Sequence, residues 1–279
     1  QFNMKSSIPF SLPLFLSLAF IESMAKPLDV FFGTGGRGSE GIYHATFNSE
    51  NGKFTPSKLA AKVGSPGFLT THPNGKILYS VGRWDEGSGA LGYRIGEKGE
   101  LTAFTRMICP DGGSAHIAVH PSGKFLLTAQ YGGGSVALFP LDSSGKLGEP
   151  TVTEHQGGSK VVDRRQDSPH PHWTGFSPDG NYALIPDLGL DQIVIYKVHS
   201  SKPAITPHGV GQSVPGGGPR HMRFSIDGRF IYLLNELNLS VTTFAWDAQK
   251  GTAKALSTTP AISQEVKAGE SFNSAAEIL

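Results

Sequence analysis

Four stretches of the chain share one pattern of apolar and polar positions. Each places a turn between two short apolar runs: THPNGKILYSVGR from Thr71, VHPSGKFLLTAQY from Val119, FSPDGNYALIPDL from Phe176 and FSIDGRFIYLLNE from Phe224. The glycines of the four turns are spaced by 48, 57 and 48 residues. After the second run comes another Gly-, Asn- or Asp-rich turn and a further apolar run. Short runs of this composition between turns predict β-strands.

The repeat predicts a β-propeller. Three or four short strands in each repeat of about 50 residues are the pattern of one propeller blade. The sequence after the N-terminal apolar run has no convincing 3.6-residue stripe, so we expect an all-β fold. The 36 glycines and 19 prolines agree with many turns. A repeated hairpin in a two-sheet sandwich is the alternative, and the constant period disfavours it.

The two ends of the repeat region are irregular. The stretch DVFFGTGGRGSEGIYHATFNSENGKF, before the first repeat, contains outer-strand material without a preceding turn. This is typical of a propeller that begins in mid-blade. A further repeat starts at FNSAAEIL, and the sequence stops inside its apolar run. We therefore expect a chain truncated at about five blades, lacking roughly the last two, rather than a compact small propeller.

The N-terminus has the pattern of a secretory signal peptide over about residues 4–25. Met4 and Lys5 precede the apolar run IPFSLPLFLSLAFI, and Ser23 and Ala25 supply small residues for cleavage. The run is shorter than the ~20 residues of a membrane span. Residues 1–3 precede the expected start, and residues 26–279 form the predicted propeller domain. We expect a secreted or periplasmic protein; a disordered N-terminal tail is the alternative.

Charge and cysteine content narrow the function classes. The net charge is +1, from 24 basic and 23 acidic residues, which does not favour nucleic acid as a partner. The single cysteine, Cys109, excludes an internal disulfide and multi-cysteine zinc sites, and we interpret it as a small core residue. The HPH motif at 170–172 lacks a second cluster of ligands, so we expect no metal and no cofactor. Nothing in the sequence indicates an oligomeric state.

Two glycine-rich motifs and the absence of a third motif bear on the kind of site the sequence predicts. GTGGRG at 33–38 does not open a helix, so a phosphate-binding loop is not predicted. YGGGS at 131–135 is interpreted as a turn between strands. The chain has no G-x-S-x-G motif, so a serine esterase mechanism is not indicated.

The repeat alignment predicts which polar residues share one edge. The strands flanking each turn form a hairpin, so the first strand starts where the second one ends. In a propeller the first strand lines the channel, so these residues surround one channel mouth. The alignment puts His172 and Arg220 at equivalent places in adjacent blades, and Glu236 at the end of the strand paired with that of Arg220. The nine extra residues of the third spacing belong to a loop over about 155–171, above the same edge.

This combination of residues is plausible for hydrolysis. A histidine near its ordinary pKa can take a proton from water, and an arginine can stabilise an oxyanion or hold an anionic group. Glutamate can orient the histidine or act as the base. The alternative is that these groups form structural hydrogen bonds between blades. We take His172, Arg220 and Glu236 as candidate catalytic residues. Candidate substrate-binding residues are His221, His116, Gln130, Asn235, Arg83 and His170.

Several motifs resemble the seven-bladed β-propeller lactonase family. They are SPGFLTTHPNGKILYSV, VHPSGKFLLTAQYGGGSVALFPL, PHPHWTGFSPDG, PDLGLDQIVIYKV, GGGPRHMRFSIDGRFIYLLNELNLSVTTF and SAAEI. The resemblance runs from about Asp29 to Leu279, and GPRHM with NEL and YGGGSV carries most of its specificity. The family includes bacterial propeller-type 6-phosphogluconolactonases, with fungal carboxy-muconate cyclases as relatives.

The resemblance implies a seven-bladed propeller with a pocket at the channel mouth, and hydrolysis of a sugar lactone without a metal. His172 in PHPH, Arg220 in GPRH and Glu236 in NEL match polar positions proposed for the family's site. The family also carries an arginine in the blade after AEI, beyond the end of this sequence, so we expect that member of the site to be missing.

We therefore expect a hydrolase that opens a sugar lactone such as 6-phosphogluconolactone or gluconolactone to the aldonic acid, with His172 or Glu236 as general base. Secretion favours a non-phosphorylated substrate. A lactonizing cycloisomerase acting on a muconate-type diacid is one alternative, and a non-catalytic secreted binding scaffold is another. A rim closed by ion pairs or bulky side chains would favour the scaffold.

Overall fold

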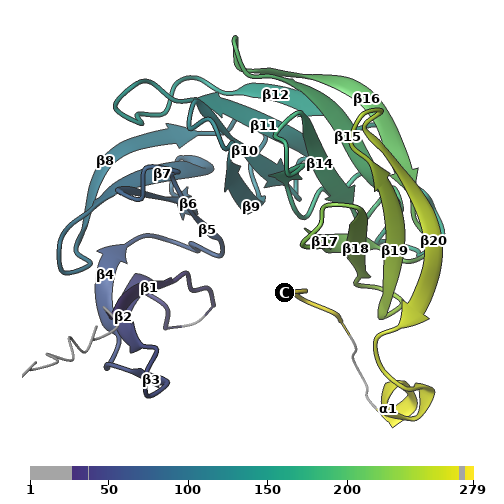
Figure 1. The fold of residues 1–279 in the computed structure, drawn as a ribbon, viewed down its shortest axis with the longest axis horizontal. Coiled ribbons are helices and arrows are strands. Elements are labelled where there is room, and N and C mark those ends of the chain that lie inside the picture. Colours follow the sequence, from purple (N-terminus) through teal and green to yellow (C-terminus); the bar gives the residue numbers. More distant parts are fainter. Residues whose placement is uncertain (1–26, 37, 270–273) are drawn as a thin grey trace, which may run out of the picture.

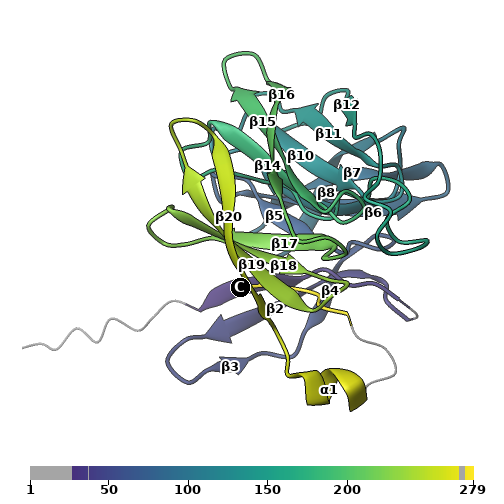
Figure 2. The same cartoon turned by 90° about the vertical axis from the view of Figure 1, so that its right-hand side faces the viewer.

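The computed structural model describes residues 27–36, 38–269 and 274–279. These residues form 20 strands and one short helix, so the predicted all-β class is confirmed. The helix α1 (Gln264–Gly269), which the sequence pattern did not predict, stands apart from the sheets (Figures 1 and 2). Within the described part of the chain, no helix has the length and apolar character needed to span a membrane. The proposed signal peptide lies outside the described residues.

The strands form five four-stranded antiparallel sheets that follow one another along an arc (Figure 1). The first contains β1 (Leu28–Phe32), β2 (Gly41–Asn48), β3 (Lys53–Phe54) and β4 (Lys58–Lys62), and the second β5 (Leu69–Thr71), β6 (Ile77–Trp84), β7 (Gly87–Ile95) and β8 (Leu101–Ile108). The third contains β9 (Ser114–Val119), β10 (Phe125–Gln130), β11 (Ser135–Pro140) and β12 (Thr151–Glu154). The fourth contains β13 (Gly175–Phe176), β14 (Tyr182–Asp187), β15 (Gln192–His199) and β16 (Ala204–Gln212), and the fifth β17 (Pro219–Phe224), β18 (Phe230–Asn235), β19 (Ser240–Asp247) and β20 (Thr252–Pro260).

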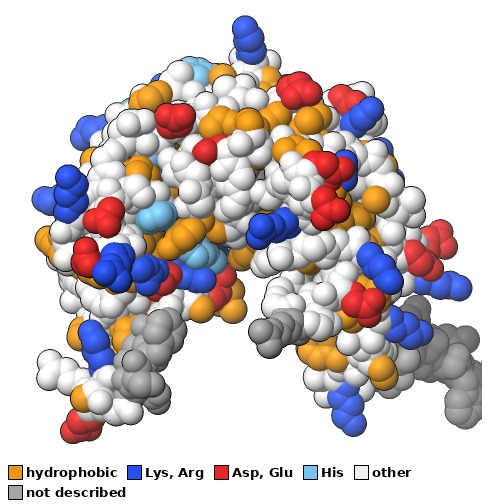
Figure 3. Space-filling view, turned by 180° about the vertical axis from the view of Figure 1, so that it is seen from behind, with side chains coloured by type: hydrophobic (Ala, Val, Ile, Leu, Met, Phe, Trp, Pro, Cys, Tyr) orange, Lys and Arg blue, Asp and Glu red, His pale blue; other side chains and the backbone are white. Residues whose placement is uncertain are grey.

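The arc has the radial order of propeller blades. Strands β5, β9 and β17 lie nearest its centre, and β8, β12, β16 and β20 lie outermost (Figure 1). The space between the first and fifth sheets is open in the ribbon and in the space-filling view from behind (Figures 1 and 3). The first strands of the second to fifth sheets therefore line the concave side, as the repeat alignment predicted.

The four sequence repeats are the second to fifth sheets, and the segment before them forms the first. Strand β1 pairs only with β2, as expected for a sheet that begins without its inner strand. Residues 274–279, where we predicted another repeat to start, form no strand. They return to the centre of the arc beside β17, where the backbone oxygen of Ala276 accepts a hydrogen bond from Arg220 (Figure 1).

The repeated turns connect neighbouring sheets. Nε2 of His72 lies 3.1 Å from the carbonyl oxygen of Gly123, and Nε2 of His120 lies 3.0 Å from that of Gly180. These glycines have φ angles of 69° and 72°, in the left-handed region that side chains disfavour. The HP turn motif thus recurs because its histidine reaches the turn of the next blade.

Apolar cores lie between the sheets. One buried cluster joins the second and third sheets through residues such as Tyr79 and Phe139, and another joins the fourth and fifth through Ile195 and Phe244. Two further clusters join the first sheet to the second and the third to the fourth. Each sheet is therefore held by its neighbours, and the polar mouth rests on this packed frame.

Candidate active site

His172 and Arg220 reach the same channel mouth from neighbouring sheets. His172 precedes β13, and its backbone amide donates to the Pro186 oxygen of β14 at 3.1 Å. Arg220 lies in β17, where the pairing register with β18 shifts between Pro219 and His221. Such an irregularity changes the direction in which a side chain points relative to a regular strand. The structure therefore brings the two residues together, in the arrangement drawn from the repeat alignment.

Glu236 follows β18 and lies between two arginines. Arg220 Nε donates to Glu236 Oε2 at 2.9 Å, and Arg165 Nη2 donates to Oε1 at 2.7 Å. The residue is only 8% exposed, so both bonds are largely shielded from water. Because both carboxylate oxygens are engaged, Glu236 is arranged to orient the guanidinium groups rather than to act as a free base.

Arg165 is the site residue that sequence reasoning missed. It comes from the loop between β12 and β13, in the insertion that the repeat spacing predicts above this rim. The neighbouring Gln166 anchors that loop, because its amide nitrogen donates to the Leu188 oxygen at 2.9 Å and to Asp191 Oδ1 at 2.6 Å. The basic pair in DRRQ, inside an insertion expected at the mouth, was the signal that could have identified it.

His172 is held in a neutral form. Its Nδ1 lies 3.2 Å from Nε2 of His221, and its ring packs edge-on against Tyr131 with centroids 5.3 Å apart. Burial, followed by the nearby charge of Arg220, lowers its pKa from 6.5 to about 3. The pKa of this histidine therefore differs from the ordinary value assumed in the sequence analysis, because its ring is partly buried beside a guanidinium group.

A cavity of about 320 Å³ opens at this mouth beside His172. It is lined by Ser65, Gly82, Arg83, Ser88, Gly113, Ser114, Ala115, Tyr131 and His172. Arg83, near the end of β6, is exposed in it and supplies a cation, and Tyr131 lies close to Arg165. The volume falls in the range of small-molecule sites, at the low end. One wall of the cavity therefore lies beside the Arg165–Glu236 ion pair.

Two of the other predicted histidines have supporting places. His170 donates from Nδ1 to the Tyr131 carbonyl oxygen at 2.9 Å and stacks on the Tyr131 ring at 4.7 Å, so it positions that residue. His116 is buried, with its ring centroid 3.8 Å from that of Phe68, and it lines a separate cavity of about 460 Å³ rather than the one beside His172. Burial, followed by the charge of His221, holds its pKa well below the usual value. His221 itself lies between His116 and His172.

Gln130 and Asn235 lie behind the cavity surface. Both are fully buried. The Gln130 side chain donates to Thr128 and accepts from Ser114, and Asn235 donates to Ser240 and Thr242. Asn235 Oδ1 also accepts from Ser213, which follows β16 of the fourth sheet. The polar atoms of both side chains are therefore engaged with other protein groups, and the prediction that they line the pocket finds no support in this arrangement.

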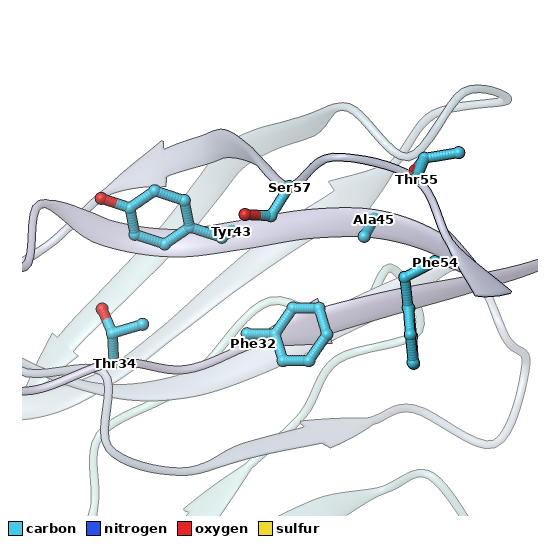
Figure 4. A pocket seen from close by; sticks show the side chains of 7 residues that line it. All are labelled: Phe32, Thr34, Tyr43, Ala45, Phe54, Thr55 and Ser57. Atoms are coloured by element: carbon cyan, nitrogen blue, oxygen red, sulfur yellow. The ribbon is translucent and has the colours of Figure 1, made fainter.

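Other candidate features lie apart from the mouth. Cys109 is buried in the core, and burial raises its thiol pKa. In the described ranges no group of three or more His, Cys, Asp or Glu side chains is placed to hold a metal. A cavity of about 440 Å³ on the first sheet is lined by Phe32, Thr34, Tyr43, Ala45, Phe54, Thr55 and Ser57 (Figure 4). Its lining has no charged side chain, so the mouth at His172 is the stronger site.

Comparisons with known proteins agree with the fold. The family model described as "Lactonase, 7-bladed beta-propeller" matches residues 29–279. A 6-phosphogluconolactonase of Bacillus subtilis is 34% identical over 226 residues, which cover 81% of this chain and 64% of the relative. This chain thus spans slightly less than two thirds of that relative's length.

Solved structures give the same result. The periplasmic gluconolactonase of Pseudomonas aeruginosa superposes with a TM-score of 0.76 at 31% identity, covering 86% of this chain and 69% of the other. A Bacteroides fragilis protein superposes with a TM-score of 0.79 at 30% identity, covering 87% and 70%. Together with the family match over almost the whole described chain, these similarities show that the protein belongs to the seven-bladed β-propeller lactonase family.

Proposed function

We propose that this protein hydrolyses a sugar lactone to its aldonic acid in the cavity beside His172. The observation that carries the proposal is His172 in the cavity wall, with one ring nitrogen bonded to His221, and the neighbouring Arg220 oriented by the buried carboxylate of Glu236. Membership of the lactonase family supports the reaction class, as do the names of the Bacillus subtilis and Pseudomonas aeruginosa relatives.

In the first step, His172 takes a proton from a water molecule while the water oxygen bonds to the lactone carbonyl carbon. The carbonyl π electrons move to its oxygen, which becomes an oxyanion. Arg220 is suited to stabilise that oxyanion, because Nε is held by Glu236 and Nη1 by Ala276, while no hydrogen bond occupies Nη2 within the described residues. A fixed cation aimed at developing charge needs little reorganisation during the reaction.

In the second step, the carbonyl re-forms and the bond between carbonyl carbon and ring oxygen breaks. The departing ring oxygen takes the proton back from His172, so the product carries a free carboxyl and a hydroxyl group, and the histidine is again neutral. We assign the proton to His172 rather than to Glu236, because both oxygens of Glu236 are occupied by arginines. Arg83 can bind an anionic or hydroxyl substituent from the cavity wall.

The ion pairs at the rim do not close the cavity. Arg165, Glu236 and Arg220 form a connected group, which on its own would suit a binding scaffold. However, the cavity beside them stays open to about 320 Å³, with His172 and Arg83 in its lining. The open cavity is the reason for preferring an enzyme to a scaffold.

The substrate and location are the finer part of the proposal. We infer secretion from the signal-peptide pattern over residues 4–25, and a secreted enzyme would meet a non-phosphorylated sugar lactone more often than a sugar phosphate. The test is acid release, followed by pH-stat, from δ-gluconolactone and from its 6-phosphate, with uncatalysed hydrolysis subtracted. We expect faster turnover of the unphosphorylated lactone. Preference for the phosphate would overturn the substrate, and no turnover of either by folded protein would overturn the function.

A further inference from the structure

Glu277 begins a chain of three side chains that ends at the candidate base. Its Oε2 lies 2.9 Å from Nδ1 of His221, and Nε2 of His221 lies 3.2 Å from Nδ1 of His172. His221 is 4% exposed, whereas Glu277 keeps contact with solvent. A hydrogen-bonded route therefore runs from residues 274–279, across the inner strand β17, to the cavity wall.

The direction of donation along this chain follows from the chemistry of its ends. An ionised carboxylate can only accept a hydrogen bond, so Nδ1 of His221 carries the proton that it shares with Glu277. A neutral imidazole has a single N–H, so Nε2 of His221 must be an acceptor. The bond at 3.2 Å is then donated by Nδ1 of His172, and Nε2 of His172 is left without a proton.

The surroundings of His221 keep it neutral. Phe68 and His116 pack against its ring, with centroids 5.9 and 5.5 Å away. Burial lowers the pKa of His221, Glu277 opposes that effect, and the charges of Arg220 and Arg223 reinforce it. A doubly protonated His221 would donate from both nitrogens and reverse the bond to His172, so its neutrality sets the direction.

Glu277 also fits the repeat. Arg220 bonds to the backbone of Ala276 and His221 bonds to the side chain of Glu277, so the two pairs of residues run side by side. In the other repeats the position of His221 is taken by Phe68, His116 and Trp173, and none of these side chains hydrogen bonds to a carboxylate within the described residues. The acid is thus specific to this one junction.

We propose that Glu277 is a positioning residue that fixes His172 as its Nδ1–H tautomer, with Nε2 bare and ready to accept a proton. The tautomer is a property of the resting protein. Its use in taking a proton from water rests on the lactonase function proposed above.

The tautomer can be observed directly. In the full chain labelled with ¹⁵N-histidine, two-bond ¹H–¹⁵N correlation spectra at pH 7 distinguish Nδ1–H from Nε2–H rings, and the signals lost in His172→Asn assign His172. We expect the Nδ1–H pattern for His221 and His172. Glu277→Ala should move His172 to the Nε2–H form, whereas Glu277→Gln, whose amide oxygen can still accept from His221, should retain the original form.

Arg223→Gln is the matched control. Arg223 lies 3.4 Å from the other oxygen of Glu277, so this variant removes a charged neighbour but leaves the bond to His221. It should leave both tautomers unchanged. An Nε2–H pattern for His172 in the unaltered protein, or an Nδ1–H pattern that persists in Glu277→Ala, would overturn the assignment.

Turnover provides the second measurement. In Glu277→Ala, kcat should fall by roughly 10²-fold with little change in KM, since a misplaced proton removes general-base catalysis without removing substrate contacts. Glu277→Gln should recover most of that loss. If the unaltered chain shows the expected tautomers but no turnover of lactones, the proposed function fails and the role of Glu277 stands. If turnover is normal in Glu277→Ala, the positioning role fails and the lactonase stands.

Discussion

The two ends of the inner hairpins use the same kinds of residue for different purposes. At the turn end, His120 bridges to the next blade through Gly180 and has its Nδ1 2.8 Å from Ser122 Oγ, so both ring nitrogens are engaged within the frame. At the rim end, His172 has one nitrogen bonded to His221 and lies on a cavity. The turn histidine holds blades together, and the rim histidine keeps a nitrogen available for a ligand.

The difference lies in how often each position recurs. A histidine follows Thr71 and Val119 in the turns of two repeats, and both copies make the same inter-blade bond. The rim positions differ from blade to blade, so His172 and Arg220 each occur once in their register. A residue repeated in equivalent turns therefore indicates a shared structural contact between blades, and a polar residue that occurs once at the rim register indicates a role at that mouth alone.

The largest expected effect is at the rim. Arg220→Ala should lower kcat for lactone hydrolysis by about 10²–10³-fold, because it removes the oriented cation next to the reacting carbonyl. The matched control is Arg229→Ala, which removes an exposed arginine paired with Asp227 in a turn at the other end of the hairpin. Both variants should fold normally by circular dichroism. Equal activity in the two variants would remove Arg220 from the site.

A smaller effect is expected from the loop that crosses the rim. Arg165→Ala should reduce kcat/KM by about tenfold, which corresponds to about 1.4 kcal/mol, because Glu236 then loses one of the two groups that fix its carboxylate. The adjacent Arg164→Ala is the control, since the Arg164 side chain is 90% exposed and its ion pair among the described residues is with Asp163. Steady-state kinetics should give different kcat/KM values for the two variants. Equal values would mean that Arg165 has a structural role in the loop and none in catalysis.

The contrast between the two ends explains how far the sequence could lead. Glycine positions and apolar runs predicted the hairpins and therefore which residues share an edge, because hydrogen-bonded register follows from the turns. Counting residues from the turns could not identify Arg165, because its position depends on the fold of an irregular loop that Gln166 anchors. Gln130 and Asn235 have the predicted register, but their side chains are buried and bonded to neighbouring side chains such as Ser114 and Ser213, which the sequence pattern does not reveal.

The lowered pKa of His172 could not be predicted from the sequence either. It predicts that kcat/KM stays nearly constant on the acidic side of the pH profile. A general base works when unprotonated, so with a pKa of about 3 it stays active as the pH falls below 6.5. We expect kcat/KM to change by less than about twofold between pH 7 and 4.5, whereas a histidine of ordinary pKa would lose about tenfold per pH unit. A break near pH 6.5 in the measured profile would contradict the assignment of the base to a desolvated His172.

Folding must be checked across the same range, because the linkage has a definite sign. His172, His116 and His120 have lowered pKa values in the folded state, so below pH 6.5 the unfolded chain binds more protons than the folded one. Stability should therefore fall as the pH decreases, by at most about 1.4 kcal/mol per pH unit for each histidine. Urea unfolding midpoints at each pH separate this loss from any loss of catalysis.

The smallest effect on catalysis is expected at the turn end, where the change should appear in stability alone. His120→Ala removes the bond to Gly180 and a ring stacked 4.5 Å from Phe125, so the free energy of unfolding should drop by roughly 2 kcal/mol while kcat and KM stay within about twofold. Ser225→Ala provides the comparison, because its hydroxyl bonds only within its own hairpin, donating to Asp227 and accepting from the Phe230 amide, and its loss should cost about 1 kcal/mol. Denaturant unfolding and lactone kinetics on both variants test the division. If His120→Ala impaired turnover as strongly as a rim variant, the two ends of the hairpin would not be independent, since a bridge between blades would then be controlling the geometry of the mouth.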